Sequence, residues 1–533
     1  MHRPGNRIGS GLRLATRSQL TDAPPPLAPA LDAATAGWHT AFAQRLSGPL
    51  DLPVLRSAIS AVAARQDLLR YRIVDGRGVV DRPDEVPLTV VDLTDLPGAQ
   101  RAAVLDTHLA TLARMAFDPT DGLCRFAVYR LDPTDHVVAF AGHRAVFDDR
   151  TRALLSADLA AAYATGGAPL PPLGATFADY LAWRGARSRW RSTQLDPAPA
   201  RLELPADAPR LGAPGIHSGY ATSTLDTTTS ACVGDLARSL DTTAPAVLLA
   251  ALGVVLARLS GHGEVGLGTP LDGPRPPAFA RLIGSCVEVA ALRLRPDAGT
   301  SFIDQVRRAR DELSVASAPA GLGEVATAGV ARLAAMPRPG RAGSPVQVLF
   351  EPVTAGPALD LAGLTSQPVP VPVPTPVEVT VRCVPDGDRL RLDVAYDAGR
   401  YRAERIRALL ATLVHVVRQA VTAPDGPAGE LALRPDDQPA PEGNEAVLDP
   451  LGRRAAVGEL GEIAVHWPGG WLGTGRTGRY RPDGTVEPAR PVGTADPASP
   501  AGITGTAGIT ATAGTTEPAA AEAAAAEAAE PAA

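Results

Sequence analysis

The stretch VLLAALGVVLARLSGHGEVGLGTPLDG, residues 247–273, joins a long apolar helix to a strand. Its first half is almost entirely apolar, which is typical of a helix buried at the centre of a domain. Gly261 follows the last helical residues, and glycine favours the left-handed conformation that ends many helices. The segment EVGLGTP after it predicts a strand. This stretch therefore predicts a domain that combines helices with a sheet.

Helices and strands are mixed in the same way on both sides of this stretch. Upstream, residues 31–185 show helical spacing of apolar residues at 51–64 and 99–115, with short alternating strands between and after them. Downstream, residues 216–430 hold further strands and an amphipathic helix near 402–421. Strands and helices do not alternate strictly. We therefore expect two α/β (α+β) lobes with helices packed on mixed sheets, and not one doubly wound parallel sheet.

The composition excludes several classes of function. The chain has 533 residues and a formal net charge of -6, which argues against broad nucleic-acid binding. All 51 of its Lys and Arg residues are arginine, so chemistry that needs a lysine amine is excluded. The four cysteines are far apart and predict neither a metal site nor a disulfide framework. With no secretion signal and no run of apolar residues long enough for a membrane helix, we expect a cytoplasmic protein.

The ends and connections of the chain differ in composition from the two lobes. Residues 1–30 and the Ala, Thr, Gly, Pro and Glu-rich tail at 488–533 are predicted to be disordered, because they carry too few large apolar residues to form a core. A Pro and Arg-rich crossover is expected at 186–215 and a linker at 431–445. Residues 446–487 predict a further short folded piece.

Six segments between residues 35 and 430 carry a family resemblance. They are ARQDLLRYRI (64–73), GHRAVFDDR (142–150), FADYLAWR (177–184), LELPADAPR (202–210), the 247–273 stretch and IGSCVEVAALRLR (283–295). Each is weak alone, but in this order they resemble the condensation domains of non-ribosomal peptide synthetases. The resemblance implies two chloramphenicol-acetyltransferase-like lobes that form a V-shaped pseudo-dimer. It also implies a channel between the lobes that receives the phosphopantetheine arms of carrier proteins.

The resemblance places a family motif, H-H-x-x-x-D-G, on His143, Arg144, Asp148 and Asp149. In the family the second histidine assists the attack of an amine on a thioester. Arg144 holds this position, and a guanidinium has only N–H donors and no acceptor, so it cannot serve as a general base. Asp149 replaces the glycine and adds bulk and charge. We expect it to pair with Arg144 or Arg150 and to obstruct the channel.

The form H-R-x-x-x-D-D resembles the X-domains of glycopeptide-antibiotic synthetases. These keep the condensation fold without its activity, and they recruit cytochrome P-450 oxygenases that modify a carrier-bound peptide. The resemblance therefore implies a docking protein of antibiotic biosynthesis whose partners are a peptidyl-carrier protein and a tailoring oxygenase, with no catalytic residue intact. No cofactor or metal is expected on the chain itself, although the phosphopantetheine arm of a partner carrier can enter it.

The same residues also have structural interpretations. By analogy with the family, His143 is mostly a packing residue, and Asp148 forms a buried salt bridge with Arg70. Arg150 and Glu288 are expected to line the channel, Glu288 at a position where the family usually has asparagine. Changes at Arg144 and Asp149 are also compatible with drift in a retired active site.

The C-terminal segments 447–465 and 473–487 resemble parts of an adenylation domain. Arg476 stands where that family has an aspartate for the ribose hydroxyls, and the catalytic lysine is missing. We interpret residues 446–487 as a remnant without ATP chemistry that can still form a small hairpin. Two alternatives to the docking function stay open at this point. One is an active condensation-type transferase that forms an amide or ester from a carrier thioester, and the other is an evolutionary remnant without a task.

Overall fold

The computed structural model describes residues 39–489 except 75–76, 83–85, 145, 189–201, 210–217, 273–275, 318–331, 334–345, 354–357, 376, 436–442 and 468–469. By internal contacts the chain divides into two units, residues 1–490 and 491–533, and all described residues belong to the first. The predicted disordered segment at 1–30 and all of the predicted disordered tail at 488–533 except residues 488 and 489 lie outside the described residues, as do most of the predicted crossover and part of the predicted linker.

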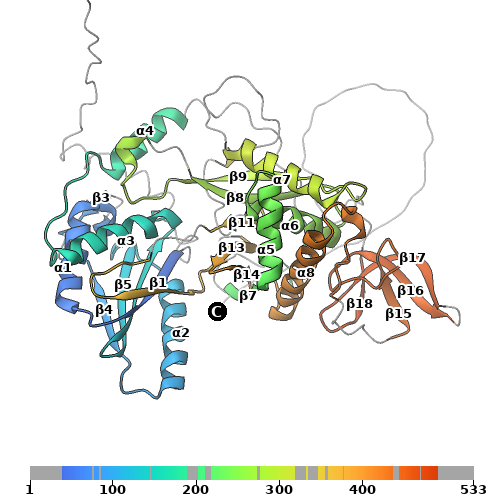
Figure 1. Ribbon diagram of the computed structural model, residues 1–533, viewed down its shortest axis with the longest axis horizontal. Helices are drawn as coiled ribbons and strands as arrows, with labels where there is room; N and C mark the ends of the chain where they lie inside the picture. The colour runs from blue at the N-terminus through green and yellow to red at the C-terminus, as the bar shows by residue number, and fades with distance from the viewer. Residues whose placement is uncertain are drawn as a thin grey trace, which may run out of the picture. The chain divides into compact units, whose positions relative to one another are not determined.

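The first lobe is built on a five-stranded sheet with helices on both faces (Figure 1). The strand order is β12-β1-β6-β5-β4, and only β4 and β5 run parallel. The strands are β1 (His39–Ser47), β4 (Leu88–Asp92), β5 (Cys124–Asp132), β6 (Asp135–His143) and β12 (Thr365–Val369), and a separate hairpin joins β2 (Tyr71–Val74) to β3 (Arg77–Val80). The helices are α1 (Leu52–Arg65), α2 (Gly98–Arg114), α3 (Asp149–Ala164) and α4 (Phe177–Ser188), with a 3-10 turn at Asp67–Arg70.

Alternation along β5 divides the first lobe into two apolar layers. Phe126 and Val128 point into the core shared with α1 and α3. Ala127 and Tyr129 point to the opposite face, which α2 covers. Because side chains alternate along a strand, the central strands of this sheet are buried on both faces. This explains the nearly continuous apolar composition of β5 and β6.

The second lobe is built on a seven-stranded mixed sheet in the order β10-β9-β8-β11-β13-β14-β7. Its strands are β7 (Ser218–Thr224), β8 (Val265–Asp272), β9 (Val287–Leu294), β10 (Arg332–Leu333), β11 (Val348–Pro352), β13 (Val379–Asp386) and β14 (Arg389–Asp397). Its helices are α5 (Thr227–Ser239), α6 (Ala244–Ser260), α7 (Phe302–Ser317) and α8 (Ala403–Thr422), with 3-10 turns at Pro277–Phe279 and Ala428–Glu430.

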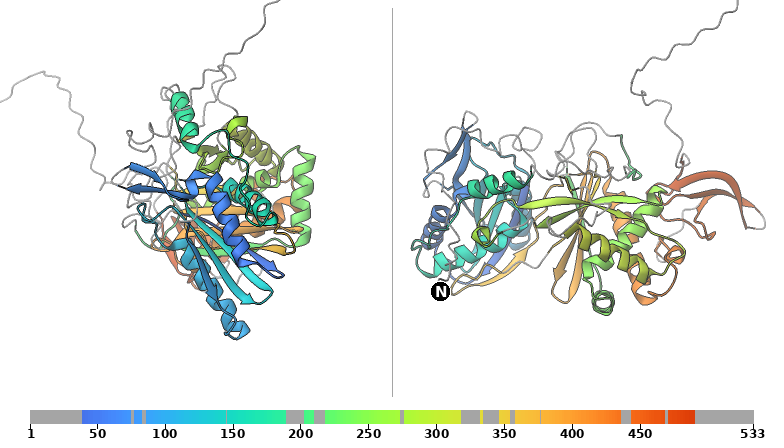
Figure 2. Two further views of the ribbon diagram at one scale, coloured as in Figure 1. Left: turned by 90° about the vertical axis from the view of Figure 1, so that its left-hand side faces the viewer. Right: turned by 90° about the horizontal axis from the view of Figure 1, so that it is seen from above.

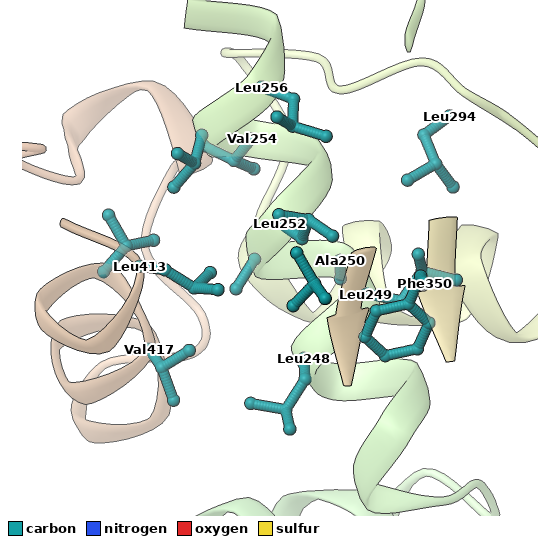
Figure 3. Packing of buried hydrophobic residues seen from close by; sticks show 14 of the residues in the cluster. Leu248, Leu249, Ala250, Leu252, Val254, Leu256, Leu294, Phe350, Leu413 and Val417 are labelled. Atoms are coloured by element: carbon teal, nitrogen blue, oxygen red, sulfur yellow. The ribbon is translucent and has the colours of Figure 1, made fainter. Parts of the chain in front are cut away.

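Helix α6 is the central helix of the second lobe. Leu248, Leu252 and Leu256 are 1% exposed or less. Figure 3 shows Leu252 between α8, which carries Leu413 and Val417, and Phe350, and shows Leu256 on the side of Leu294. Gly261 ends α6 in the left-handed conformation with φ 76°, as the sequence predicts. The apolar composition of residues 246–256 therefore reflects burial on every side.

Two segments from beyond residue 216 belong to the core of the first lobe. Strand β12 pairs with β1 in the first sheet, where it is the amber strand beside the blue ones in Figure 1. Phe279, Leu282 and Ile283, on the connection between β8 and β9, pack among the side chains of α1 and α3. The prediction that residues 216–430 form one separate lobe is wrong for these segments. The first lobe is therefore completed by two segments from the second half of the sequence.

Residues 445–489 form a four-stranded antiparallel sheet, which is larger than the small hairpin expected for this region (Figure 2, red). Its strands are β15 (Glu445–Leu448), β16 (Gly461–Trp467), β17 (Gly470–Tyr480) and β18 (Val486–Pro488). Arg258 at the end of α6 connects this sheet to the second lobe. Its Nη2 lies 3.3 Å from a carboxylate oxygen of Asp449 and also binds Glu459, and its main-chain carbonyl accepts the N–H of Leu460 at 3.3 Å.

No single helix in the described part of the chain is long and apolar enough to cross a membrane. Helices α5 and α6 reach the length and apolar composition of a membrane span only when they are taken together, and the chain bends by 104° between them.

Candidate functional site

The loop that carries the predicted motif is held tightly between β6 and α3. The N–H groups of Val146 and Phe147 both donate to the carbonyl of His143, each at 2.9 Å. Gly142 is required here, because a Cβ at this position would lie 2.4 Å from the ring of Phe147. Asp148 then caps α3 by accepting the N–H of Thr151 at 3.1 Å. The described part of the loop therefore presents the side chains of His143, Arg144, Asp148 and Asp149 from a fixed backbone.

The ring of His143 is buried in an aromatic cluster. It is 1% exposed, and its centroid lies 6.4 Å from that of His39 and 6.3 Å from that of Phe117. His39 is itself fixed by a contact of 2.6 Å between its Nδ1 and the carbonyl of Ala113, at the end of α2. This is the environment of a packing residue of the first lobe.

Arg144 is buried and reaches from the first lobe to the sheet of the second lobe. The residue is 5% exposed, and its Nη2 lies 2.6 Å from the Oε1 of Glu351 on β11. The other oxygen of Glu351 accepts the Nε–H of Arg382 at 2.7 Å. Glu351 and Arg382 are direct neighbours in the parallel pairing of β11 with β13. One carboxylate is thus held between two guanidinium groups that come from different lobes.

Arg144, Glu351 and Arg382 form a triad of buried charges, and the charge of each depends on the others. Burial alone would raise the pKa of Glu351, but the adjacent charges of Arg144 and Arg382 lower it below its ordinary value. Burial likewise disfavours the charged guanidinium of Arg382, and Glu351 reverses this and raises the pKa of Arg382. Glu351 is therefore a carboxylate, and its charge compensates the buried charge of Arg144.

The expected contact between Arg144 and Asp149 is long and secondary. Asp149 Oδ2 lies 3.7 Å from Arg144 Nη2, and its side chain is 57% exposed. Solvent screening makes such a contact weak compared with the buried pair to Glu351. The principal partner of Arg144 is thus Glu351, which the sequence interpretation missed. A signal was present, because Glu351 and Arg382 are single charged residues within the apolar strands VQVLFEP and VTVRCV.

The predicted salt bridge between Asp148 and Arg70 is not formed. Arg70 binds Asp67 at 2.6 Å and donates to the carbonyls of Ala63 and Asp81. Besides capping α3, Asp148 accepts the N–H of Cys286 through Oδ2 at 3.0 Å. The pairing fails because the arginine is engaged by its own 3-10 turn and by α1. Asp148 instead ties the motif loop to the connection that crosses from the second lobe.

The two predicted channel residues lie on different elements. Arg150 is exposed in the first turn of α3. Glu288 lies on β9, where its backbone pairs with Leu271, and its side chain lies outside the described part of the structure. Arg476, at the position of the ribose-binding aspartate of adenylation domains, is exposed on β17.

Among the described residues, no group of three or more His, Cys, Asp or Glu residues is placed to hold a metal ion. Cys124 and Cys383 are buried, and burial raises the pKa of each thiol to about 12. Because the thiolate is the reactive form of cysteine, neither is suited to nucleophilic chemistry at neutral pH.

Comparisons with known proteins agree with this architecture. The Condensation domain family model matches residues 28–328. Phosphinothricin tripeptide synthetase PhsB from Streptomyces viridochromogenes is 31% identical over 287 residues, which is 50% of this chain and 24% of the synthetase. The corresponding synthetase PhsC is 29% identical over 51% of this chain and 27% of its own length. This chain therefore spans about a quarter of these relatives.

Solved structures show the same fold at lower identity. The X-domain from teicoplanin biosynthesis superposes with a TM-score of 0.61 at 24% identity, over 76% of this chain and 95% of that one. SgcC5 from Streptomyces globisporus gives a TM-score of 0.58 at 21% identity, over 74% and 94%. Together with the family match and the two-lobed mixed α/β fold, these findings show that the chain belongs to the condensation-domain family of non-ribosomal peptide synthetases.

Proposed function

We propose that this chain is a non-catalytic condensation-type domain that docks a carrier-bound peptide and a tailoring cytochrome P-450 oxygenase in antibiotic biosynthesis. The observation that carries the proposal is the buried ion pair between Arg144 and Glu351. Arg144 occupies the motif position at which the family resemblance expects a histidine that assists amide formation.

The chemistry of the pair opposes catalysis in two ways. A general base must accept a proton or a hydrogen bond, and the guanidinium of Arg144 only donates. The loss of a positioned base typically costs about 10²–10⁴ in rate. The carboxylate of Glu351 is engaged on both oxygens by Arg144 and Arg382, so it does not replace the base. The triad also fills space between the motif loop and β11, where the family's channel is expected.

The comparisons support the choice of partners. The X-domain of teicoplanin biosynthesis is known in complex with OxyB, and that structure superposes over 82% of this chain at 24% identity with a TM-score of 0.60. At 24% identity, this similarity shows a shared fold and does not by itself show a shared partner. The docking proposal therefore depends on residues 143–149, which have the H-R-x-x-x-D-D form. The chain itself would hold no cofactor, and the phosphopantetheine arm would come from the carrier.

The test is a binding and turnover experiment on the purified full chain. A carrier protein loaded with a peptidyl-phosphopantetheine and candidate P-450 oxygenases would be titrated against the chain. The same mixtures would be assayed for new amide or ester bonds. We expect saturable binding of the loaded carrier and of one oxygenase, without transfer. Binding should persist in Arg144→Ala, because this side chain is buried and is not part of a docking surface.

One observation favours a second candidate function, a condensation-type acyltransferase. Asp149 is 57% exposed, so solvent reaches the start of α3 next to the ion pair. Positioning of two bound substrates can provide much of a rate enhancement without a base. Transfer by the unmodified chain well above the uncatalysed rate would establish this function and contradict the proposal that the chain is non-catalytic.

A further inference from the structure

Strand β4 is an edge strand of the first sheet, and among the described strands it pairs with β5 alone. Thr89, Val90 and Asp92 are exposed, and the apolar side chain of Val90 belongs to a residue that is 42% exposed. Helix α2, which covers one face of this sheet, packs on β1, β5 and β6. The outer side of β4 is therefore an open sheet edge.

The sequence of β4 leaves this edge unprotected. Natural proteins usually protect a sheet edge with charged residues, with proline or by keeping the edge strand very short. Three other edge strands of the described sheets do so, because β12 contains Pro368, β10 has two residues, and β18 has three residues and ends at Pro488. Residues 88–91 of β4 hold neither a charge nor a proline. The β-branched side chains of residues 89–91 also favour an extended, paired strand.

The backbone of β4 presents hydrogen-bonding groups at this edge. The N–H of Leu93, just after the strand, donates to the carbonyl of Arg130 on β5 at 2.9 Å. The backbone groups of successive residues point to opposite sides of a strand, so those of residues 89 and 91 also point to β5. The backbone groups of Leu88, Val90 and Asp92 then point outwards. Each of these three residues offers one donor and one acceptor to a strand that pairs with the edge.

We propose that two copies of this chain associate through β4, with their strands antiparallel and a twofold axis at Val90. In this register Val90 lies opposite Val90 of the second copy, and Leu88 lies opposite Asp92 of the second copy. Each opposed pair exchanges two backbone hydrogen bonds, so all three outward-pointing residues are used. A register centred on Asp92 would place two carboxylates opposite each other, which is unfavourable.

The charges of β4 are compatible with a second copy of the same strand. In the register centred on Val90, the two Asp92 residues are about four positions apart along the strands, or about 13 Å at about 3.3 Å per residue. This separation exceeds the screening length of about 8 Å at physiological ionic strength. Arg130 also lies 3.5 Å from Asp92 on the same copy and offsets its charge. The two exposed Val90 side chains meet at the centre, where pairing removes apolar surface from water.

The contact is small, because β4 has only five residues. It buries less than the roughly 1,000 Å² expected of a stable interface, so the association is weak and reversible. We expect a dissociation constant on the order of 10⁻⁴ M. This surface is separate from the motif loop, and the inference does not depend on the proposed docking function.

The experiment measures the mass of the full chain by sedimentation equilibrium, at concentrations on both sides of about 10⁻⁴ M. Val90→Lys and Val90→Glu each place like charges opposite each other at the twofold axis, and each should weaken the dimer at least about tenfold. An equimolar mixture of the two variants should restore association, because opposite charges then meet. Both variants should keep the Tm of the unmodified chain in dilute solution, because Val90 is exposed and has no described strand beyond it.

Thr365→Lys is the matched control, because Thr365 is an exposed residue of β12 at the opposite edge of the same sheet. This variant should associate as the unmodified chain does. A chain that stays monomeric at every concentration would overturn the proposal and leave the edge to an extended segment of another protein. Association that both Val90 variants retain would place the contact elsewhere and overturn it as well. A mixture of the two variants that stays monomeric, while the unmodified chain dimerises, would contradict the twofold register.

Discussion

Arg144 and Glu351 form a buried ion pair of 2.6 Å between the motif loop of the first lobe and strand β11 of the second. Arg144 is 5% exposed and Glu351 1%, so neither charge has water as an alternative partner. Removing one member of such a pair leaves an uncompensated buried charge, which is more costly than removing both. The pair is therefore expected to matter for stability as well as for the loss of catalysis.

The first prediction concerns the stability of this pair. Glu351→Gln should lower the free energy of unfolding by about 3–5 kcal/mol, because it leaves Arg144 and Arg382 facing a neutral amide. Asp149→Asn is the control and should cost less than about 1 kcal/mol, because Asp149 is half-exposed and 3.7 Å from Arg144. Urea unfolding of the full chain measures both. Equal effects of the two substitutions would contradict the assignment of Glu351 as the principal partner.

The second prediction is the pH dependence of that stabilisation. The pKa of Glu351 is lowered in the folded protein, so the unfolded chain binds this proton more readily as the pH falls. The stability that the ionised carboxylate contributes is complete above its ordinary unfolded pKa of 4.5 and is lost as the pH falls through the lower folded value. The difference between the unmodified chain and Glu351→Gln should therefore be constant from pH 6 to 8 and shrink below 4.5. A difference that grows on acidification would contradict this sign.

The third prediction separates the loss of the base from the presence of Glu351. Arg144→His alone should stay inactive in the transfer assay, because an adjacent carboxylate favours the protonated imidazolium, which cannot accept a proton. Arg144→His combined with Glu351→Gln, which keeps an amide oxygen for Arg382, should transfer at least tenfold faster than Arg144→His. Activity of the single variant equal to that of the double one would show that Glu351 is irrelevant to inactivation.

The fourth prediction concerns Asp148, which caps α3 and also holds Cys286 from the crossing connection. Asp148→Ala should cost more stability than Asp226→Ala. Asp226 is the matched cap of α5, and among the described residues it contacts its own first turn and Arg418 at the surface. An N-cap is worth about 0.5–2 kcal/mol, and we expect an additional cost of about 1–3 kcal/mol for the buried N–H of Cys286 that loses its acceptor. Chemical unfolding measures the loss of stability in both variants. Equal losses would contradict a contribution from the contact between Asp148 and Cys286.

The fifth prediction concerns the C-terminal sheet. Arg258→Met should loosen residues 445–489, because Asp449 and Glu459 lose a shared buried partner. Asp449 keeps Arg453, so the sheet itself should stay folded. Hydrogen exchange should rise at Leu460, whose N–H bonds the carbonyl of Arg258, and change little in the first lobe. Arg407→Met, at an exposed pair on α8, is the control. Unchanged exchange at Leu460 would contradict the connecting role of Arg258.

Several elements could be predicted from local sequence because local rules decide them. Asp51 caps α1 with a proline in its first turn, and Gly261 ends α6, as expected from side-chain and backbone chemistry within a few residues. Strand β12 could not be predicted in the same way. Its sequence, TSQPV, leads into a proline-rich run that does not suggest a strand, and it forms one by pairing with β1.

The candidate site also combines features that local sequence determines with features that depend on tertiary packing. That Arg144 cannot accept a proton is a property of the guanidinium, so the sequence alone determined it, together with the family and its two mixed lobes. Only the tertiary structure decided that Arg144 is neutralised by Glu351, 207 residues away, and that Asp148 binds Cys286 and not Arg70. Partners at such separations are chosen by the packing of the two lobes, and the periodicity of a single segment carries no information about what lies opposite it.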